Sequence, residues 1–285
     1  MYKHRLKFRI QKMCRVLKVS KSGYYQWLNR KPSARELERQ KRRRRIQHYF
    51  NHFKRRAGSR PITAALREEG HKWSSKTVER CMKAMGLKSI VARKYKATTN
   101  ANHSLPVHDN TLNQDFNVSA PNKVWVTDIT YIATREGWLY LASVMDLFSR
   151  KIVGWSLGSR MTRELVIDAL DQAYERRKPE PGLIHHSDRG SQYASTDYQE
   201  KLKQYKMIGS MSRKGNCYDN ACIESFHSTL KKELVYQTTF HTRAQAIEAL
   251  NSYIAFDYNR LRLHSSLGYK SAHRFEQLYD QKSAV

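Results

Sequence analysis

The sequence predicts an α/β protein in which a mixed sheet flanked by helices follows a set of purely helical segments. Apolar residues recur at helical spacing up to about residue 95, and from Val124 the pattern changes to runs of β-branched and aromatic residues. The expected order from Val124 is three strands, a helix, a strand, a helix, a strand and two helices. That order is typical of a mixed five-stranded sheet with flanking helices.

Residues 1–35 are expected to form a basic helical segment. Apolar residues recur at helical spacing over residues 8–17, and a short polar turn separates them from an aromatic helix over residues 24–28. Ser20 or Ser22 would cap the second helix. This pattern fits the second half of a helix-turn-helix unit, and a plain helical hairpin is the alternative.

Residues 36–95 indicate a better helix-turn-helix domain. A long basic helix is expected over residues 36–57, a second helix begins near Pro61, and a third follows after Gly70. A serine pair caps the third helix, which would lie in a DNA groove. A basic three-helix packing module is the alternative. The groove end of the third helix would present Ser75, Lys76 and Arg80.

Residues 96–121 lose helical periodicity and are expected to form a linker before a core domain over residues 122–240. The first part of this core reads as an antiparallel meander, because three strand-like runs are joined by short turns. The expected strands are Val124–Ala133, Trp138–Phe148 and Lys151–Leu157.

The second part of the core alternates helices and strands. Expected elements are a helix over 163–177, a strand over 183–187, a helix over 195–205, a short strand over 207–211 and a helix over 219–235. Residues 241–285 would add a long helix over 242–261 and a tail.

The charge of the chain indicates a polyanionic partner. Its 53 Lys and Arg against 25 Asp and Glu leave a formal charge of +28, and residues 1–60 hold 21 of these cations against two acids. Such a one-signed run favours nucleic acid, with a membrane surface as the minor alternative. No stretch approaches the ~20 apolar residues of a membrane span, so we expect a cytoplasmic, nucleoid-associated protein.

Three acids suggest a catalytic centre. Asp128 lies in the first expected strand, Asp188 ends the fourth, and Glu224 lies on the helix over 219–235, with thirty-five residues between Asp188 and Glu224. Acids at two strand ends and on a helix can meet and hold two divalent cations for phosphoryl transfer. Mg²⁺ prefers oxygen ligands, whereas a zinc site using Cys217, Cys222 and nearby histidines is a minor alternative.

Helical periodicity divides the helix around Glu224 into two faces. Ile223, Phe226, Leu230 and Leu234 would form its buried stripe. The second face carries a lysine two turns, ~10 Å, beyond Glu224, which suits a helix lying beside a phosphate backbone. This face comprises Asn220, Glu224, His227 and Lys231.

Several motifs together resemble the second-frame transposases of the third insertion-sequence family, bacterial DDE recombinases related to retroviral integrases. The resemblance spans about residues 10–275, and the acid spacing followed by a lysine seven residues after Glu224 makes it specific. The motifs are Trp125-x-x-Asp128-Ile129-Thr130, His186-Ser187-Asp188-Arg189-Gly190-Ser191-Gln192-Tyr193, Ser210-Met211-Ser212-Arg213-Lys214-Gly215-Asn216, Asp219-Asn220-Ala221-x-x-Glu224-Ser225-Phe226 and the C-terminal Tyr258-Asn259-x-x-Arg262-x-His264-Ser265-Ser266-Leu267-Gly268-Tyr269.

The resemblance implies an RNase H-like catalytic core and a metal-binding triad of Asp128, Asp188 and Glu224. It also implies a transposase that binds terminal inverted repeats and uses two Mg²⁺ or Mn²⁺ ions to cleave and transfer DNA strands. The chain departs from the family at Leu263 and near Ala272, where the family usually has proline. A homo-oligomer of at least two copies on paired ends is expected. The upstream-frame product, which carries a leucine zipper in this family, is a further expected partner.

Two alternatives to the transposase remain, namely a nuclease of the same fold that cuts without joining and a non-catalytic DNA-binding regulator. Two helix-turn-helix candidates argue against the first, and three clustered acids argue against the second. The residues expected to contact DNA are Lys231, His227, Asn220, Arg213, Lys214, Ser75, Lys76, Arg80, Arg60, Ser22 and Tyr24.

Overall fold

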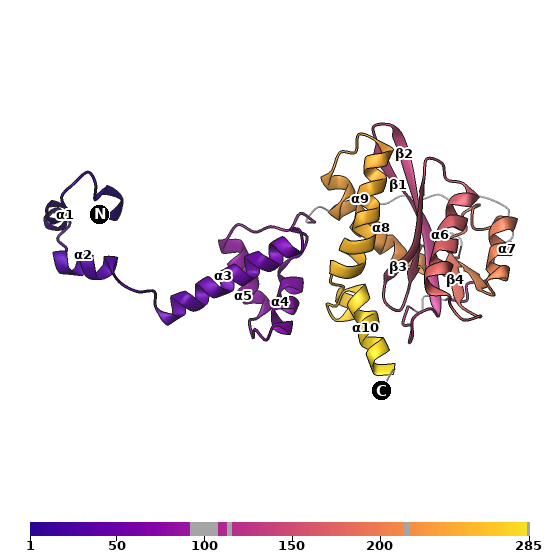
Figure 1. Cartoon of the computed structure of the whole chain (residues 1–285), viewed down its shortest axis with the longest axis horizontal. Coiled ribbons are helices and arrows are strands. Elements are labelled where there is room, and N and C mark those ends of the chain that lie inside the picture. The colour runs from indigo at the N-terminus through magenta and orange to yellow at the C-terminus, as the bar shows by residue number, and fades with distance from the viewer. Residues whose placement is uncertain (92–107, 113–115, 214–216, 284–285) are drawn as a thin grey trace. The chain divides into compact units, whose positions relative to one another are not determined.

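The computed structural model describes residues 1–91, 108–112, 116–213 and 217–283 (Figure 1). The chain divides into two compact units, residues 1–48 and residues 49–285. The sheet and its helical layers belong to the second unit. Within the described ranges, no helix combines the length and the apolar character that crossing a bilayer requires.

The first unit begins with short helices, as the sequence predicts. η1 (Tyr2–His4) and α1 (Ile10–Val16) precede α2 (Lys21–Leu28). Ser20 is the N-cap of α2, because its hydroxyl oxygen accepts a hydrogen bond from the Gly23 backbone N–H at 3.0 Å. Cys14 and Tyr24 are the buried side chains of these two helices.

The basic helix α3 (Ala34–His52) is shorter at its C-terminal end than the predicted helix over 36–57. Lys54 and Arg55 adopt left-handed φ values of 51° and 62°, which a right-handed helix cannot include. The Arg55 N–H donates to the Phe50 carbonyl at 2.8 Å, a bond that closes the helix end.

Two further helices confirm the prediction for residues 58–86. α4 (Ser59–Glu68) and α5 (Ser75–Ala84) pack through apolar side chains that include Ile62 and Val78, both fully buried. Ser74 caps α5, since its hydroxyl oxygen accepts from the Thr77 N–H at 3.2 Å.

The five-stranded sheet has the order β3-β2-β1-β4-β5. The first three strands form an antiparallel meander, whereas β4 and β5 run parallel to β1, so the sheet is mixed as predicted. Each strand begins and ends within two residues of its expected bounds. The strands are β1 (Val124–Thr134), β2 (Gly137–Asp146), β3 (Lys151–Gly158), β4 (Ile184–Ser187) and β5 (Ile208–Met211).

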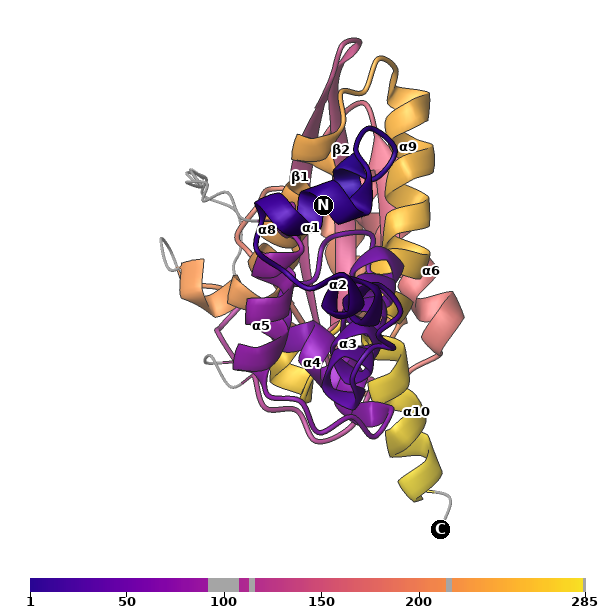
Figure 2. The ribbon, with the colours of Figure 1, turned by 90° about the vertical axis from the view of Figure 1, so that its left-hand side faces the viewer.

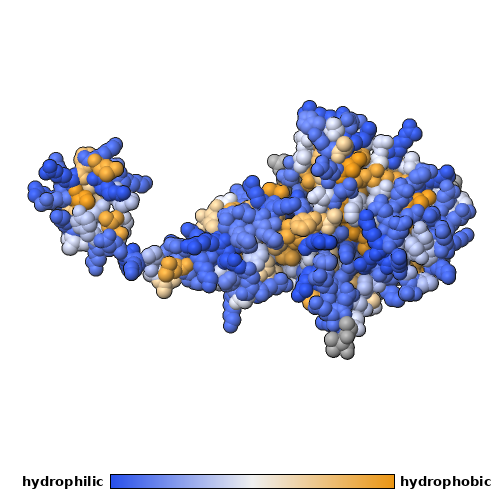
Figure 3. Space-filling model, in the orientation of Figure 1, coloured by the Kyte–Doolittle hydropathy of each residue, from blue (hydrophilic) through white to orange (hydrophobic). Residues whose placement is uncertain are grey.

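Helices cover both faces of the sheet (Figures 1 and 2). On one face, α6 (Arg163–Arg177) and α7 (Thr196–Gln204) enclose a core that includes Trp125. On the other face, α8 (Ala221–Glu233) and α9 (Arg243–Ser252) enclose a second core around Val126. The alternation of Trp125 and Val126 between the two cores follows from the two-residue period of a strand. The outer surface in Figure 3 is mostly hydrophilic, with small apolar areas between the polar regions.

The described part of the predicted linker packs against the core instead of spanning free solvent. Leu112 is buried in the α8 side of the core, and Phe116 and Val118 pack beside it. The Thr111 N–H donates to the Ser210 hydroxyl oxygen at 3.0 Å, which ties this segment to β5. Residues 96–107 and 113–115 of the predicted linker lie outside the described residues.

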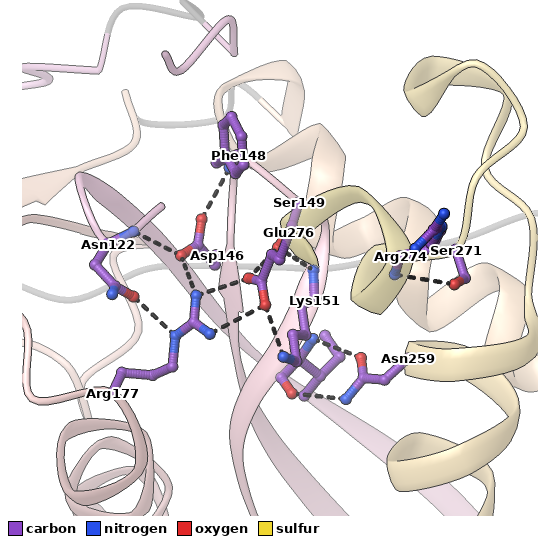
Figure 4. A network of polar contacts seen from close by, with 11 residues as sticks. Asn122, Asp146, Phe148, Ser149, Lys151, Arg177, Asn259, Ser271, Arg274 and Glu276 are labelled. Atoms are coloured by element: carbon purple, nitrogen blue, oxygen red, sulfur yellow. Dashed lines mark hydrogen bonds and ion pairs between the residues drawn. The ribbon is translucent and has the colours of Figure 1, made fainter. Parts of the chain in front are cut away.

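The C-terminal region differs from its prediction in two respects. The expected helix over 242–261 continues from α9 as a π-helical segment, η4 (Tyr253–Leu261). The expected tail contains a further helix, α10 (Ala272–Ser283). Figure 4 shows how α10 is attached to the core: its buried Glu276 bonds to Arg177 of α6 and Lys151 of β3. These partners are more than ninety residues away in the chain, so the local sequence around Glu276 does not predict these contacts.

Candidate active site

The pairing of β1 and β4 brings Asp128 and Asp188 to one level of the sheet. The strands are parallel neighbours, and Val126 stands opposite His186. Each aspartate lies two residues farther along its strand direction, so Asp188 follows at the level of Asp128. Neighbouring strands are roughly 4.8 Å apart. The short strand β4 thus places its terminal acid next to the acid of β1.

Backbone N–H groups hold both aspartates. The Ile129 N–H donates to Asp128 Oδ1 at 2.8 Å, and the Gly190 N–H donates to Asp188 Oδ1 at 2.9 Å. Burial and, after it, the negative charges of Asp128 and Glu224 together raise the pKa of Asp188 to about 7, against the hydrogen bond from Gly190. Each aspartate therefore has one oxygen oriented by the main chain.

Glu224 comes from α8, which packs against the sheet near Asp128. It lies in the first turn of α8, which Ile223, Phe226 and Leu230 anchor in the core, as the periodicity predicts. Burial and then the charge of Asp128 raise the pKa of Glu224. Asp128 thus acts electrostatically on both other acids, and the three predicted carboxylates share one region of the structure.

His227 and Asn220 are turned inward, which corrects their assignment to the DNA-contact face. His227 is 6% exposed, with Nδ1 3.4 Å from Asp128 Oδ2 and Nε2 2.9 Å from the Ser143 hydroxyl oxygen. The Asn220 side-chain amide donates to the Thr127 carbonyl at 3.0 Å. Both residues therefore brace α8 against β1 and β2, and His227 approaches the second oxygen of Asp128.

Lys231 lies farther along α8, and its side chain contacts Tyr131 of β1. Its Nζ stands 4.4 Å from the centroid of the Tyr131 ring, a cation–π geometry. Burial lowers the pKa of Lys231, and the charge of Asp128 opposes this shift. The lysine is thus near enough to the acids to feel Asp128, yet it is held against an aromatic ring.

Ser143 is a site residue that the sequence did not reveal, and Tyr193 is a motif residue whose contact with the site the sequence did not reveal. Ser143 on β2 is fully buried behind Asp128, which pairs with it across the sheet. The Tyr193 hydroxyl lies 3.3 Å from Thr127 Oγ1, and burial followed by the charge of Asp128 raises the Tyr193 pKa. Tyr193 belongs to a motif that is recognisable in the sequence, whereas Ser143 lies in none of the recognised motifs.

The donor set suits Mg²⁺ better than zinc. Three carboxylates supply hard oxygen ligands, and their mutual repulsion is the kind that a divalent cation relieves. Among the described residues, no three His, Cys, Asp or Glu side chains are arranged to hold a single ion together. Mg²⁺ commonly takes one or two carboxylates and completes its shell with water and phosphate oxygens.

The neighbouring histidines have structural roles. His185 Nε2 lies 2.6 Å from the Tyr198 hydroxyl, and His186 bonds to Ser210 and Ser212 through its two ring nitrogens. Burial lowers the pKa of His186 to about 4, so it is neutral. Both rings are buried in the sheet, where His185 Nδ1 has no hydrogen-bond partner among the described residues.

The other predicted DNA-contact residues occupy varied positions. Arg213 is half-exposed at its side chain but bonds Asp219, with Nη2 2.8 Å from Oδ1, whereas Lys214 lies outside the described residues. Tyr24 is 7% exposed, so its ring packs within the first unit and does not form a contact surface. The remaining candidates are exposed or half-buried, namely Ser22, Arg60, Ser75, Lys76 and Arg80.

Comparisons with known proteins agree with this geometry. Residues 118–217 and 206–271 match family models described as integrase core domain, and residues 36–95 match an HTH-like domain. The transposase InsF for insertion sequence IS3A of Escherichia coli (strain K12) is 45% identical over 276 residues, 96% of each chain. The insertion element IS600 uncharacterized 31 kDa protein of Shigella sonnei is 45% identical over 272 residues, 95% of this chain and 100% of that protein.

Among solved structures, the catalytic core domain of HTLV-2 integrase in complex with magnesium is 19% identical, with a TM-score of 0.44. That alignment covers 55% of this chain and 97% of the viral domain. The close relatives and the two kinds of matching domain identify the family. This chain belongs to the IS3 family of insertion-sequence transposases, DDE polynucleotidyl transferases with an integrase core domain.

Proposed function

We propose that this transposase binds the terminal inverted repeats of its insertion sequence and carries out Mg²⁺-dependent DNA cleavage and strand transfer. Asp128, Asp188 and Glu224 are the proposed ligands of two ions. The observation that carries this proposal is the convergence of three carboxylates from β1, the end of β4 and the start of α8. Clustering of like charges at partly buried positions is unfavourable without a compensating cation, and active sites commonly contain it.

The protein's own residues would orient these ligands. The main-chain donors at Ile129 and Gly190 hold one oxygen of each aspartate, and His227 lies beside the second oxygen of Asp128. Glu224 projects from a helix whose buried face is anchored in the core. When bound, two Mg²⁺ ions activate the attacking oxygen and stabilise the leaving oxygen in phosphoryl transfer.

Specific DNA binding is proposed for residues 36–95. This segment matches an HTH-like domain, and α5 begins with Ser75 and Lys76 and carries Arg80 one turn later. Lys76, Arg80 and Arg60 are exposed, as contacts to phosphate or base edges require. Residues 1–35, 96–121 and 241–285 are proposed as the N-terminal helical segment, linker and C-terminal part around the core at 122–240.

Joining two ends of one element requires two active sites in one assembly, so we propose at least two copies of the chain on paired ends. The upstream-frame product of the same element is a second proposed partner. Both proposals concern assembly, and sedimentation of the purified chain with and without terminal DNA tests the first of them. A single chain per DNA end throughout the reaction would contradict it.

The decisive experiment mixes the purified chain, Mg²⁺ and DNA that carries the ends of the element. The expected result is strand cleavage followed by joined products. Asp128→Asn, Asp188→Asn and Glu224→Gln should each abolish both steps while DNA affinity stays within about twofold, because affinity comes mainly from the basic segments. Cleavage without joining would identify a nuclease, and wild-type rates in any variant would remove that residue from the site.

A further inference from the structure

The β1–β2 hairpin carries two large aromatic side chains on its surface. Tyr131 is 46% exposed and Trp138 is 51% exposed, whereas most aromatic rings described in this unit are buried or half-buried. Their ring centroids are 5.1 Å apart with an interplanar angle of 85°, an edge-to-face pair. Lys231 Nζ lies over the Tyr131 ring at 4.4 Å. These three side chains form a continuous group, which we call the Lys231–Trp138 row.

The row follows Asp128 along β1, and its lysine comes from α8, the helix that carries Glu224. Tyr131 stands three residues after Asp128 on β1, about 10 Å at 3.4 Å per residue. Trp138 pairs with Ala133, which is five residues and about 17 Å from Asp128. The charge of Asp128 acts on Lys231, so the cationic end of the row is the end nearer the acids.

The row rests on a fixed scaffold. The Trp138 carbonyl accepts a hydrogen bond from Arg243 Nε at 3.1 Å, and Glu136 accepts one from the Arg243 N–H at 2.8 Å. The Thr134 hydroxyl donates to the Gly137 carbonyl at 2.7 Å within the turn. α9 thus holds the hairpin through Arg243, and the two exposed rings stand on paired strands instead of a free loop.

We propose that the Lys231–Trp138 row binds one DNA strand next to the reacting phosphate, with Lys231 on a backbone phosphate and Trp138 stacked on an unpaired base. This inference rests on the proposed function of the acids. An ammonium group followed by exposed aromatic rings matches a nucleic-acid strand, in which phosphates and base faces alternate. A base inside a duplex is covered on both faces by its neighbours, so only a base released from its pair could stack on Trp138.

The length of the row defines which base is involved. Successive nucleotides of one strand are about 3.4 Å apart along a duplex. A distance of 10–17 Å from Asp128 therefore corresponds to a base roughly three to five nucleotides from the reacting phosphate. Stacking of one base on an aromatic side chain is worth roughly tenfold in affinity.

The test combines changes in the protein with changes in the DNA. Terminal DNA carries a single abasic site at each of the first eight positions beside the cut, and affinity and single-turnover cleavage are measured for each. The full chain is used as wild type, Trp138→Ala, Trp138→Phe and, as a control for an equally exposed aromatic, Phe256→Ala (53% exposed in the wild type). Thermal melting checks that each variant folds.

The expected result is a loss of roughly tenfold for Trp138→Ala on intact DNA, with most affinity retained by Trp138→Phe and all of it by Phe256→Ala. An abasic site at one position three to five nucleotides from the cut should cause a similar loss in the wild type. Combining it with Trp138→Ala should add nothing further, because both changes remove the same stack. A 2-aminopurine base at that position should change its fluorescence on binding to the wild type but not to Trp138→Ala.

Other outcomes overturn the inference in recognisable ways. Losses that add at every position, or a wild-type affinity for Trp138→Ala, would show that no base stacks there. A change in oligomeric state on substituting Trp138 would assign the row to contacts between copies of the chain. If the wild type binds ends but cleaves none, the proposed function fails, and the abasic and fluorescence measurements on binding still judge the row.

Discussion

Replacing Glu276 by glutamine should destabilise the second unit more than any other single change on α10. Glu276 is buried, and its two carboxylate oxygens accept four hydrogen bonds. Oε1 accepts from the Ser149 hydroxyl at 2.8 Å and from Arg177 Nη2 at 2.7 Å. Oε2 accepts from Lys151 Nζ at 2.7 Å and from Arg177 Nη1 at 3.1 Å (Figure 4).

A glutamine side chain keeps one acceptor oxygen and presents an NH₂ group to cationic donors at the other position. Two of the four bonds are lost, so Lys151 and Arg177 both lose charge compensation from Glu276, and Arg177 keeps the carboxylate of Asp146, whose Oδ2 lies 3.2 Å from Arg177 Nη2. Breaking one partner of a buried ion pair costs about 3–5 kcal/mol. We expect the lower value, because glutamine preserves the shape. At about 2–4 °C per kcal/mol for a unit of this size, the melting temperature should fall by roughly 6–12 °C.

The pH dependence of this loss identifies its cause. The ion pairs with Arg177 and Lys151 lower the pKa of Glu276 below its ordinary value of 4.5, against the effect of burial. A lowered folded-state pKa contributes stability above the unfolded-state value, and this contribution is lost as the pH falls through the folded-state value. The difference in melting temperature between wild type and Glu276→Gln should therefore be constant above about pH 5 and shrink below it.

The assay is thermal melting of both proteins across this pH range, with hydrogen exchange of the α10 amides to detect local detachment of the helix. Asp146 titrates in the opposite direction, since burial raises its pKa, and the charge of Glu276 adds to this rise, so Glu276→Gln reduces the Asp146 contribution. Glu200→Gln, an exposed acid on α7, is the matched control. A melting temperature within about 2 °C of wild type together with unchanged exchange on α10 would refute the reasoning.

Three other outcomes test the site. His227→Ala should lower single-turnover cleavage and apparent Mg²⁺ affinity by roughly 10–100-fold, because an orienting neighbour of Asp128 is lost, and unchanged Mg²⁺ dependence would contradict this role. Lys231→Ala should weaken productive DNA binding, with partial recovery at high DNA concentration and by Lys231→Arg, whereas a collapsed rate at saturating DNA would indicate proton transfer. Lys76→Ala should reduce the slope of log affinity against log salt by about 1, measured by titration, if Lys76 contacts a phosphate.

Local patterns in the sequence predicted the architecture of the core, and they pointed to the three acids proposed for the site. The strand meander, the helix over 163–177 and the buried stripe of Ile223, Phe226 and Leu230 all depend on short-range periodicity, which reports which side of an element faces the core. The acids were identifiable because their spacing and neighbouring motifs resemble one family of transposases.

Contacts between distant segments decided what this periodicity could not. His227 and Asn220 share a helical face with Glu224, yet both are buried, because β1 and β2 lie close enough to supply Ser143 and Thr127 as partners. Helical spacing shows which residues share a face but cannot show what that face meets.

The C-terminal helix α10 also depends on contacts between segments that are far apart in the chain. The buried Glu276 of α10 bonds to Arg177 of α6 and Lys151 of β3, which lie 99 and 125 residues away in the chain. A charged residue in a tail usually indicates a solvated surface, since a charge is buried only when partners compensate it. The sequence alone therefore predicted the helices and strands of the core and pointed to the three acids. Only the tertiary structure decided which polar groups are buried, because the partners that compensate a buried charge can lie far away in the chain.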